Sequence, residues 1–261
     1  MKSLNNYINE WKFNNDKNVK STNVYTYKHY PKDRQELEKI LIKRLKKNIE
    51  EPYLLDIDTS KITNMEGLFS GSVTDYLYDK GIDVKQIKKL DLSSWLTHNV
   101  TTMNYMFGSC EGLTTLIHNF NTKNVIDMSF MFCRCLRLSE LDLSELNAPK
   151  LKKMDQMFTD CYKLKHVDLS KLKPNALESV DQMFHTCIEI ESIDLSNINT
   201  THVKNMRWMF YRCEKLKQVI GIDNFDISNV YDMTYMFKNC YVLKHNDLIP
   251  AWYDINKWES H

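Results

Sequence analysis

Apolar residues recur along this chain with a period of 25 to 27 residues. The clearest marker is a Met-Phe pair, first seen at Met106–Phe107, with a weaker copy at Leu68–Phe69. With the phenylalanine as position 0, apolar residues also recur at −7, −4, +6 and +9, and a cysteine recurs at +3. The phenylalanines are Phe69, Phe107, Phe132, Phe158, Phe184, Phe210 and Phe237. Such a period predicts stacked repeats, because one copy is too small to bury its own apolar faces.

Two shorter periods alternate inside each copy. Apolar residues at −7, −4, −1 and 0 fit one face of two short helical turns. Apolar residues at +9 and +11, as in Leu141-Asp142-Leu143, fit a short strand with one buried face. The pattern therefore predicts an α/β fold with a parallel sheet on one face and short helices on the other.

The two ends of the array depart from the repeat, as terminal copies of such arrays do. We expect an N-terminal segment with a capping helix over 1–51, about seven repeats over 52–249, and a C-terminal cap over 250–261. The predicted helix follows Pro31 and has apolar and basic faces. The apolar face contains Leu37, Ile40, Leu41, Leu45 and Ile49. The basic face contains Lys39, Lys43, Arg44, Lys46 and Lys47. At the other end Pro250 is expected to stop the last strand, and Trp252, Tyr253 and Trp258 to cover the last repeat.

The repeat resembles a known family. The stretches "LDLSELNAPKLKKMDQMFTDCYKL" and "FDISNVYDMTYMFKNCYVL" are similar to BspA-type leucine-rich repeats of bacterial surface proteins. The resemblance implies a right-handed leucine-rich-repeat solenoid that takes part in adhesion or protein binding and not in catalysis. Members of that family are often exported, so the resemblance also implies a cell-surface location.

The cysteines at +3 form one column in the stacked array. They are Cys110, Cys135, Cys161, Cys187, Cys213 and Cys240. A ladder of buried free thiols is the favoured interpretation, because cysteine packs as a small apolar residue. Disulfides between neighbouring copies are disfavoured, because equivalent Cβ vectors point the same way. A metal site is a weaker alternative still, since Cys133 and Cys135 are the one close pair. The methionines at −4 and −1 are interpreted as core.

The outward positions of the predicted strands, +8 and +10, form the candidate binding face. They are Asp91, Glu140, Asp142, His166, Asp168, Ser192, Asp194, Gln218, His245 and Asp247. Neighbouring carboxylates at strand spacing repel one another by about 1 kcal/mol in water. Local hydrogen bonds, a bound protein partner or a cation could offset this repulsion. Ile117 and Ile220 interrupt the column, which disfavours a regular metal array.

A second candidate surface is an aromatic stripe at position −2. It contains Tyr105, Phe130, Trp208 and Tyr235. Tyrosine and tryptophan commonly anchor protein interfaces. Partial burial against neighbouring repeats is nevertheless the favoured interpretation of this stripe.

Composition and motifs narrow the function further. The 35 Lys and Arg nearly balance the 34 Asp and Glu, which gives no general reason to bind nucleic acid. No nucleophile, phosphate-loop or dinucleotide motif occurs, so we expect neither catalysis, nor a cofactor, nor a metal. The sequence shows no signal peptide and no membrane-spanning stretch, and free thiols favour a reducing compartment, so the expected location is cytoplasmic.

We therefore expect a non-enzymatic repeat module that recognises another protein, of unknown identity, through its sheet face. A structural spacer or subunit of a surface or particle assembly is the alternative. In that case the two end segments could mediate self-association.

Overall fold

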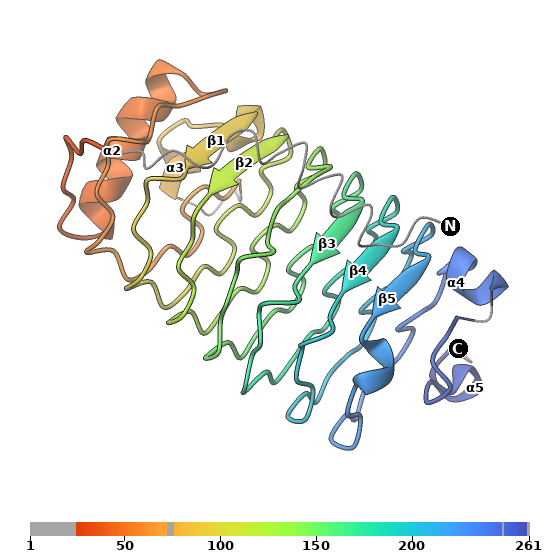
Figure 1. Ribbon diagram of the computed structural model, residues 1–261. Coiled ribbons are helices and arrows are strands. Elements are labelled where there is room, and N and C mark those ends of the chain that lie inside the picture. The colour runs from red at the N-terminus through yellow and green to blue at the C-terminus, as the bar shows by residue number, and fades with distance from the viewer. Residues whose placement is uncertain (1–24, 72–75, 247, 260–261) are drawn as a thin grey trace.

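The chain forms a stack of coils, each laid on the one before it (Figure 1). The computed structural model describes residues 25–71, 76–246 and 248–259. We number the coils 1 to 7 by their central phenylalanines, from Phe69 to Phe237. Backbone bonds join each coil to the next, as where the Phe107 N–H donates to the Met131 carbonyl at 2.9 Å.

Parallel strands occupy the predicted strand positions in five coils. Strands β1 (Lys89–Leu92) and β2 (Thr115–His118) form one sheet, and β3 (His166–Asp168), β4 (Ser192–Asp194) and β5 (Gln218–Ile220) form a second. Their register matches equivalent repeat positions, so that Val167, Ile193 and Val219 lie side by side. Residues 140–143 of coil 3 are not a strand, and the sheet is divided there.

The prediction of short helices in the Met-Phe segments is wrong, because these segments form consecutive turns. The Met106 N–H donates to the carbonyl of Met103, three residues earlier, whereas the Phe107 N–H bonds to the next coil. Residues at −2 have positive φ, which a right-handed helix excludes and which a type II turn requires at its third position. They are Gly67, Tyr105, Phe130, Gln156, Gln182, Trp208 and Tyr235. Bonding to the next coil therefore replaces the helical hydrogen bonds.

The core is a column of phenylalanine rings that runs through all seven coils. Phe158 is fully buried and stacks on Phe132 at 5.7 Å and on Phe184 at 5.2 Å between ring centroids. Each cysteine at +3 is buried beside this column, and its thiol donates to the phenylalanine carbonyl of the preceding coil. These S–H···O contacts run from Cys110, Cys135, Cys161, Cys187, Cys213 and Cys240 at 2.9–3.3 Å. The column therefore joins neighbouring coils as well as filling space.

Helix α2 (Arg34–Lys47) lies at the N-terminal end of the stack (Figure 1). The Asp33 side chain caps it by accepting from the Glu36 N–H, and Leu37, Leu41 and Leu45 are buried in the common core. Arg44, which the sequence placed on the basic face, instead pairs with the buried Asp56 at 2.8 Å. Shorter helical segments within the coils are α3 (Tyr76–Asp79), η2 (Val84–Gln86) and η3 (Ile222–Asn224).

The C-terminal end differs from the expectation. Coil 7 has helix α4 (Tyr241–His245) at the place of the predicted last strand, so Pro250 does not stop a strand. Tyr253 is buried edge-on against Phe237 with ring centroids 5.0 Å apart. Helix α5 (Ile255–Trp258) follows. None of the helices in the described ranges has the length and apolar character needed to cross a bilayer.

Candidate functional site

Aspartates line the strand ends at one repeat position. Asp91, Asp168 and Asp194 each lie in a strand and are half-buried, while Asp142 is exposed at the corresponding place of coil 3. The side chains next to them in sequence, such as Leu90 and Val167, are buried. The aspartates therefore lie on the opposite face of the sheet from the core, because side chains alternate along a strand.

Each of these aspartates makes the same local turn. One carboxylate oxygen accepts the backbone N–H of the serine two residues later, at 2.9 Å for both Asp168–Ser170 and Asp194–Ser196. Asp142 in addition accepts from the hydroxyl of Ser144 at 2.7 Å. This is an Asx turn, in which the side chain replaces a backbone acceptor and ends the strand. The local structural role that the sequence left open is therefore present.

The Asx turns also fix the direction of the second oxygen. Only Oδ1 of Asp168 and of Asp194 is engaged in the turn, and among the described residues no donor is bonded to either Oδ2. The two residues are register partners on β3 and β4, so their carboxylates stand about 4.8 Å apart, the spacing of neighbouring strands. A cationic or N–H donor placed between them would relieve their repulsion of about 1 kcal/mol.

The remaining predicted face residues divide into three groups. Glu140 and Gln218 are exposed. Ser192, which we expected to face solvent, is buried and lies 2.7 Å from His166 Nδ1, and burial lowers the pKa of that histidine. His245 is exposed on α4 and not on a strand, so it is not part of the sheet face, and Asp247 lies outside the described residues.

The aromatic stripe at −2 is half-buried and forms local stacks instead of one continuous surface. Tyr105 lies 5.9 Å from Phe130, and Trp208 lies 6.5 Å from Tyr235. Sequence reasoning missed that Trp208 also contacts two rings from other repeat positions, namely His185 and Tyr211. These four residues therefore show the partial burial that the sequence analysis favoured.

The cysteines have the properties of structural residues. All seven are free and buried. Burial raises the pKa of Cys133 to about 12 and that of Cys187 well above its ordinary value, so that the thiols stay protonated at neutral pH. A protonated thiol is a poor nucleophile and a poor metal ligand. Within the part of the chain that the structure describes, no group of three His, Cys, Asp or Glu is placed to hold a metal ion.

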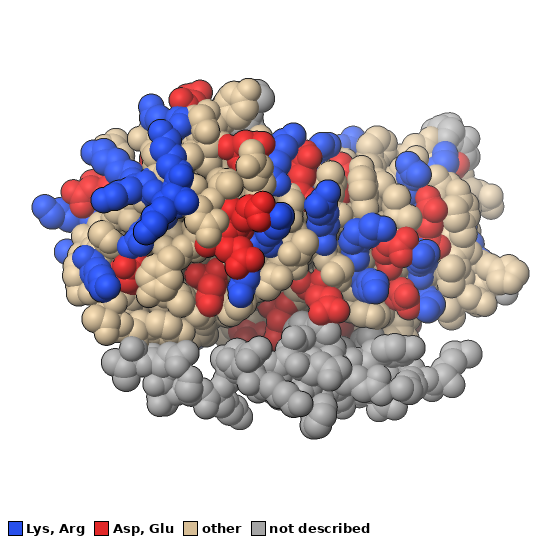
Figure 2. Space-filling view, turned by 90° about the horizontal axis from the view of Figure 1, so that it is seen from above, with Lys and Arg blue, Asp and Glu red and all other residues tan. Residues whose placement is uncertain are grey.

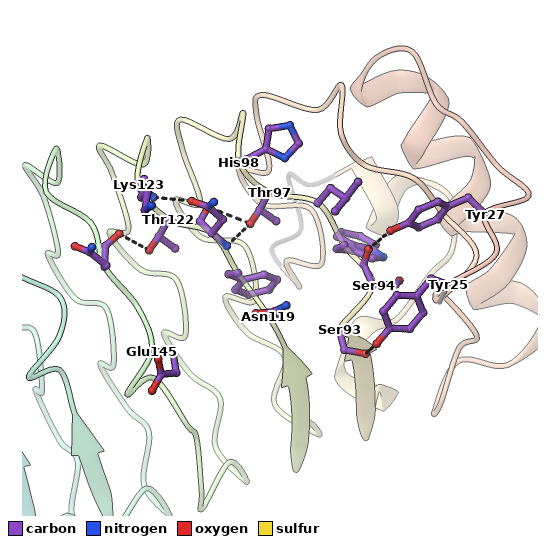
Figure 3. Close-up of a pocket in the computed structure, with 15 residues that line it drawn as sticks. Tyr25, Tyr27, Ser93, Ser94, Thr97, His98, Asn119, Thr122, Lys123 and Glu145 are labelled. Atoms are coloured by element: carbon purple, nitrogen blue, oxygen red, sulfur yellow. Dashed lines mark hydrogen bonds between the residues drawn. The ribbon is translucent and has the colours of Figure 1, made fainter. Parts of the chain in front are cut away.

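A cavity of 420 Å³ lies beyond the ends of β1 and β2, next to residues 25–27 (Figure 3). Polar groups on its wall are used to hold one segment to another. The hydroxyl of Tyr27 donates to the Ser94 carbonyl at 2.8 Å, and that of Thr97 donates to the Asn121 carbonyl at 3.1 Å. The polar side chains that line this cavity are therefore accounted for by their hydrogen bonds between chain segments.

Charge is distributed unevenly over the stack. Figure 2 shows Lys and Arg gathered at the α2 end, with basic and acidic side chains interspersed along the rest of that face. Ion pairs join equivalent positions of neighbouring coils. Lys215 meets Glu189 at 2.7 Å, and Lys217 meets Glu191 at 2.5 Å. In each of these pairs, the positive charge of one coil neutralises a negative charge of its neighbour.

The repeat pattern matches one protein-family model. The model is described as "Mycoplasma protein of unknown function, DUF285", and it matches residues 75–193 and 142–252, together more than half of the chain. The chain belongs to the DUF285 family. The two DUF285 matches overlap in the middle of the array, as expected for a model that spans several near-identical coils. No curated protein matches the chain.

Two solved structures show limited similarity to this DUF285 protein. One is the T. pallidum leucine-rich-repeat protein, with 18% identity and a TM-score of 0.39 over 62% of this chain and 76% of that chain. The other is TLR13 in complex with ssRNA13, with 18% identity and a TM-score of 0.35 over 69% of this chain and 24% of that chain. The chain thus spans about a quarter of the TLR13 structure.

Proposed function

We propose that this protein is a non-enzymatic interaction module that binds a basic segment of another protein through the aspartates of its sheet face. The observation that supports it most is the pair Asp168 and Asp194, whose Asx turns hold two neighbouring carboxylates in fixed directions. Fixed acceptors lose little conformational entropy on binding, which favours affinity. A lysine or arginine side chain suits them best, because charge-assisted hydrogen bonds are about twice as strong as neutral ones.

The finer parts of this account are also proposals. We propose a right-handed solenoid in which α2 caps coil 1, with domain limits at 51 and 249 and repeats of the BspA type. Adhesion is the role that the BspA-type resemblance favours. A cytoplasmic location is supported by the seven free cysteines, and a cell-surface location by the resemblance. Sedimentation velocity tests the spacer alternative and self-association through the ends, both of which require an oligomer.

A paired set of variants tests the sheet face. Changing Asp168 and Asp194 to Asn removes two charges but keeps an oxygen that can accept in each Asx turn. The control changes Asp58 and Asp226 to Asn, because these residues make the same turn with Ser60 and Ser228 at another repeat position. Proteins captured from an extract of the source cells on each variant are then quantified by mass spectrometry.

The expected result is a protein that is retained by the wild type and by the Asp58/Asp226 control but lost from the Asp168/Asp194 variant. Equal retention of every captured protein by all three baits would refute the assignment of the sheet face.

A further inference from the structure

The second sheet ends at β5 with an unpaired edge. One edge of β5 pairs with β4 through Ile193–Val219 and its neighbours. In the next coil, residues at the predicted strand position form α4 instead of a strand, and among the described residues no strand pairs with the outer edge. Bonds alternate between the two sides of a parallel strand, and Leu195 N–H donates to the Ile220 carbonyl. The Val219 N–H and C=O therefore point to the outer edge.

An apolar groove runs beside this edge. It has a volume of 300 Å³ and lies between β5 and the segment that follows α4. Its apolar lining consists of Val219, Ile222, Phe237, Leu243, Leu248, Ile249, Pro250 and Ala251. Leu248 is 50% exposed at the groove, so a large apolar side chain is accessible beside the open strand edge. Backbone donors and apolar surface are thus available together, as an added strand requires.

The charge beside the groove specifies what such a strand should contain. The side-chain charge at position +7 alternates in sign over coils 4 to 6, from Lys165 to Glu191 to Lys217. Lys217 pairs with Glu191 on one side and remains 60% exposed. The equivalent residue of coil 7 is Lys244, which pairs with Glu259 at 2.5 Å and cannot continue the alternation. Among the described residues, no acidic side chain therefore pairs with Lys217 on its outer side.

We propose that the outer edge of β5 binds an extended segment of a separate polypeptide as an additional parallel strand. The segment has an acidic residue followed two and four residues later by apolar residues. The acidic side chain pairs with Lys217, the main chain bonds to Val219, and the apolar side chains enter the groove beside Leu248. The strands of both sheets are parallel, which favours the same direction for the added strand.

The chain itself supplies the probe for a binding experiment. A fluorescein-labelled peptide with the sequence of residues 190–197, IESIDLSN, contains Glu191, Ile193 and Leu195 at the required spacing and omits Glu189, the native partner of Lys215. We expect its fluorescence anisotropy to rise and saturate when full-length protein is added. A peptide in which Ile193 and Leu195 are replaced by Asp should not bind.

Two variants and two matched controls locate the site. Lys217→Glu and Leu248→Asp should each weaken peptide binding by about fivefold or more, the equivalent of about 1 kcal/mol. Lys215→Glu is the charge control, because Lys215 makes a similar ion pair with Glu189 away from the groove lining. Ile255→Asp is the apolar control, since Ile255 is 43% exposed on α5. Both controls should bind as the wild type does.

A charge exchange gives a gain of function that a folding defect cannot imitate. A peptide with Glu191→Lys should bind the Lys217→Glu protein more tightly than it binds the wild type. Absence of saturable binding by the parent peptide would overturn the proposal, as would equal binding by the two groove variants and their controls. A dimer of the full-length protein that Leu248→Asp dissociates and Ile255→Asp does not would also overturn it, because a second copy would then be the occupant.

Discussion

The Asx turns of the sheet face make a quantitative prediction about stability. Replacing Asp168 and Asp194 with Ala removes two hydrogen bonds to the backbone N–H groups of Ser170 and Ser196, both at 2.9 Å. Each such bond contributes about 0.5–1.5 kcal/mol. All four residues are half-buried, so water replaces part of this loss and the lower half of the range applies. The lost bonds therefore destabilise the double variant by about 1–2 kcal/mol.

Removing the two charges has the opposite effect. At a separation of about 4.8 Å, their repulsion in water is about 1 kcal/mol. The Ala variant should thus be destabilised by a net of about 0–1 kcal/mol. The Asn variant keeps both acceptors and loses the repulsion, so it should be as stable as the wild type or more stable by up to about 1 kcal/mol.

Urea denaturation followed by circular dichroism measures the difference. The free energy of unfolding of the Asn variant should exceed that of the Ala variant by about 1–2 kcal/mol, with equal m-values. Equal midpoints for the two variants would refute the reasoning, because the turns would then contribute nothing to the folded state.

Three further predictions concern the interior. Phe158→Ala should destabilise the protein by about 3–5 kcal/mol, because the ring is fully buried between two others, whereas Phe158→Leu should cost less than half as much. Urea denaturation measures both losses, and equal losses would contradict the stacked column. Burial lowers the pKa of His118, so below about pH 6.5 the unfolded chain binds more protons than the folded one, and the stability of the protein should fall on acidification. His118→Gln should flatten the dependence of the urea midpoint on pH, and the same dependence in the variant and the wild type would show that His118 does not contribute. Native protein should resist iodoacetamide at all seven thiols and react at all seven in urea, as mass spectrometry would record, and rapid native labelling of any cysteine at +3 would contradict its burial.

The repeat positions could be predicted because they recur. Phe158 and Cys161 each belong to a column of equivalent residues, and one period placed all of them inside. The alternation around Asp168 likewise predicted a strand with that residue facing outward. These features depend on the positions of apolar residues, which the sequence shows directly.

The turns could not be predicted in the same way. Apolar residues at −7, −4, −1 and 0 fit a helix, and the choice of turns depends on backbone bonds to the next coil, such as Phe107 to Met131. Nothing in the side chain of Tyr105 or Trp208 signals a positive φ, and glycine occupies this position only in coil 1, at Gly67. One visible signal did exist for the missing last strand, because Asn246 stands where the other repeats have an apolar residue.

The affinity of the captured partner at increasing salt concentration tests the central claim most directly. Wild-type protein and the Asp58/Asp226→Asn control should lose affinity together as salt rises, because both retain the sheet-face carboxylates. The Asp168/Asp194→Asn variant should bind more weakly at low salt and show a smaller salt dependence. The same affinity and the same salt dependence in all three proteins would contradict binding through the sheet face.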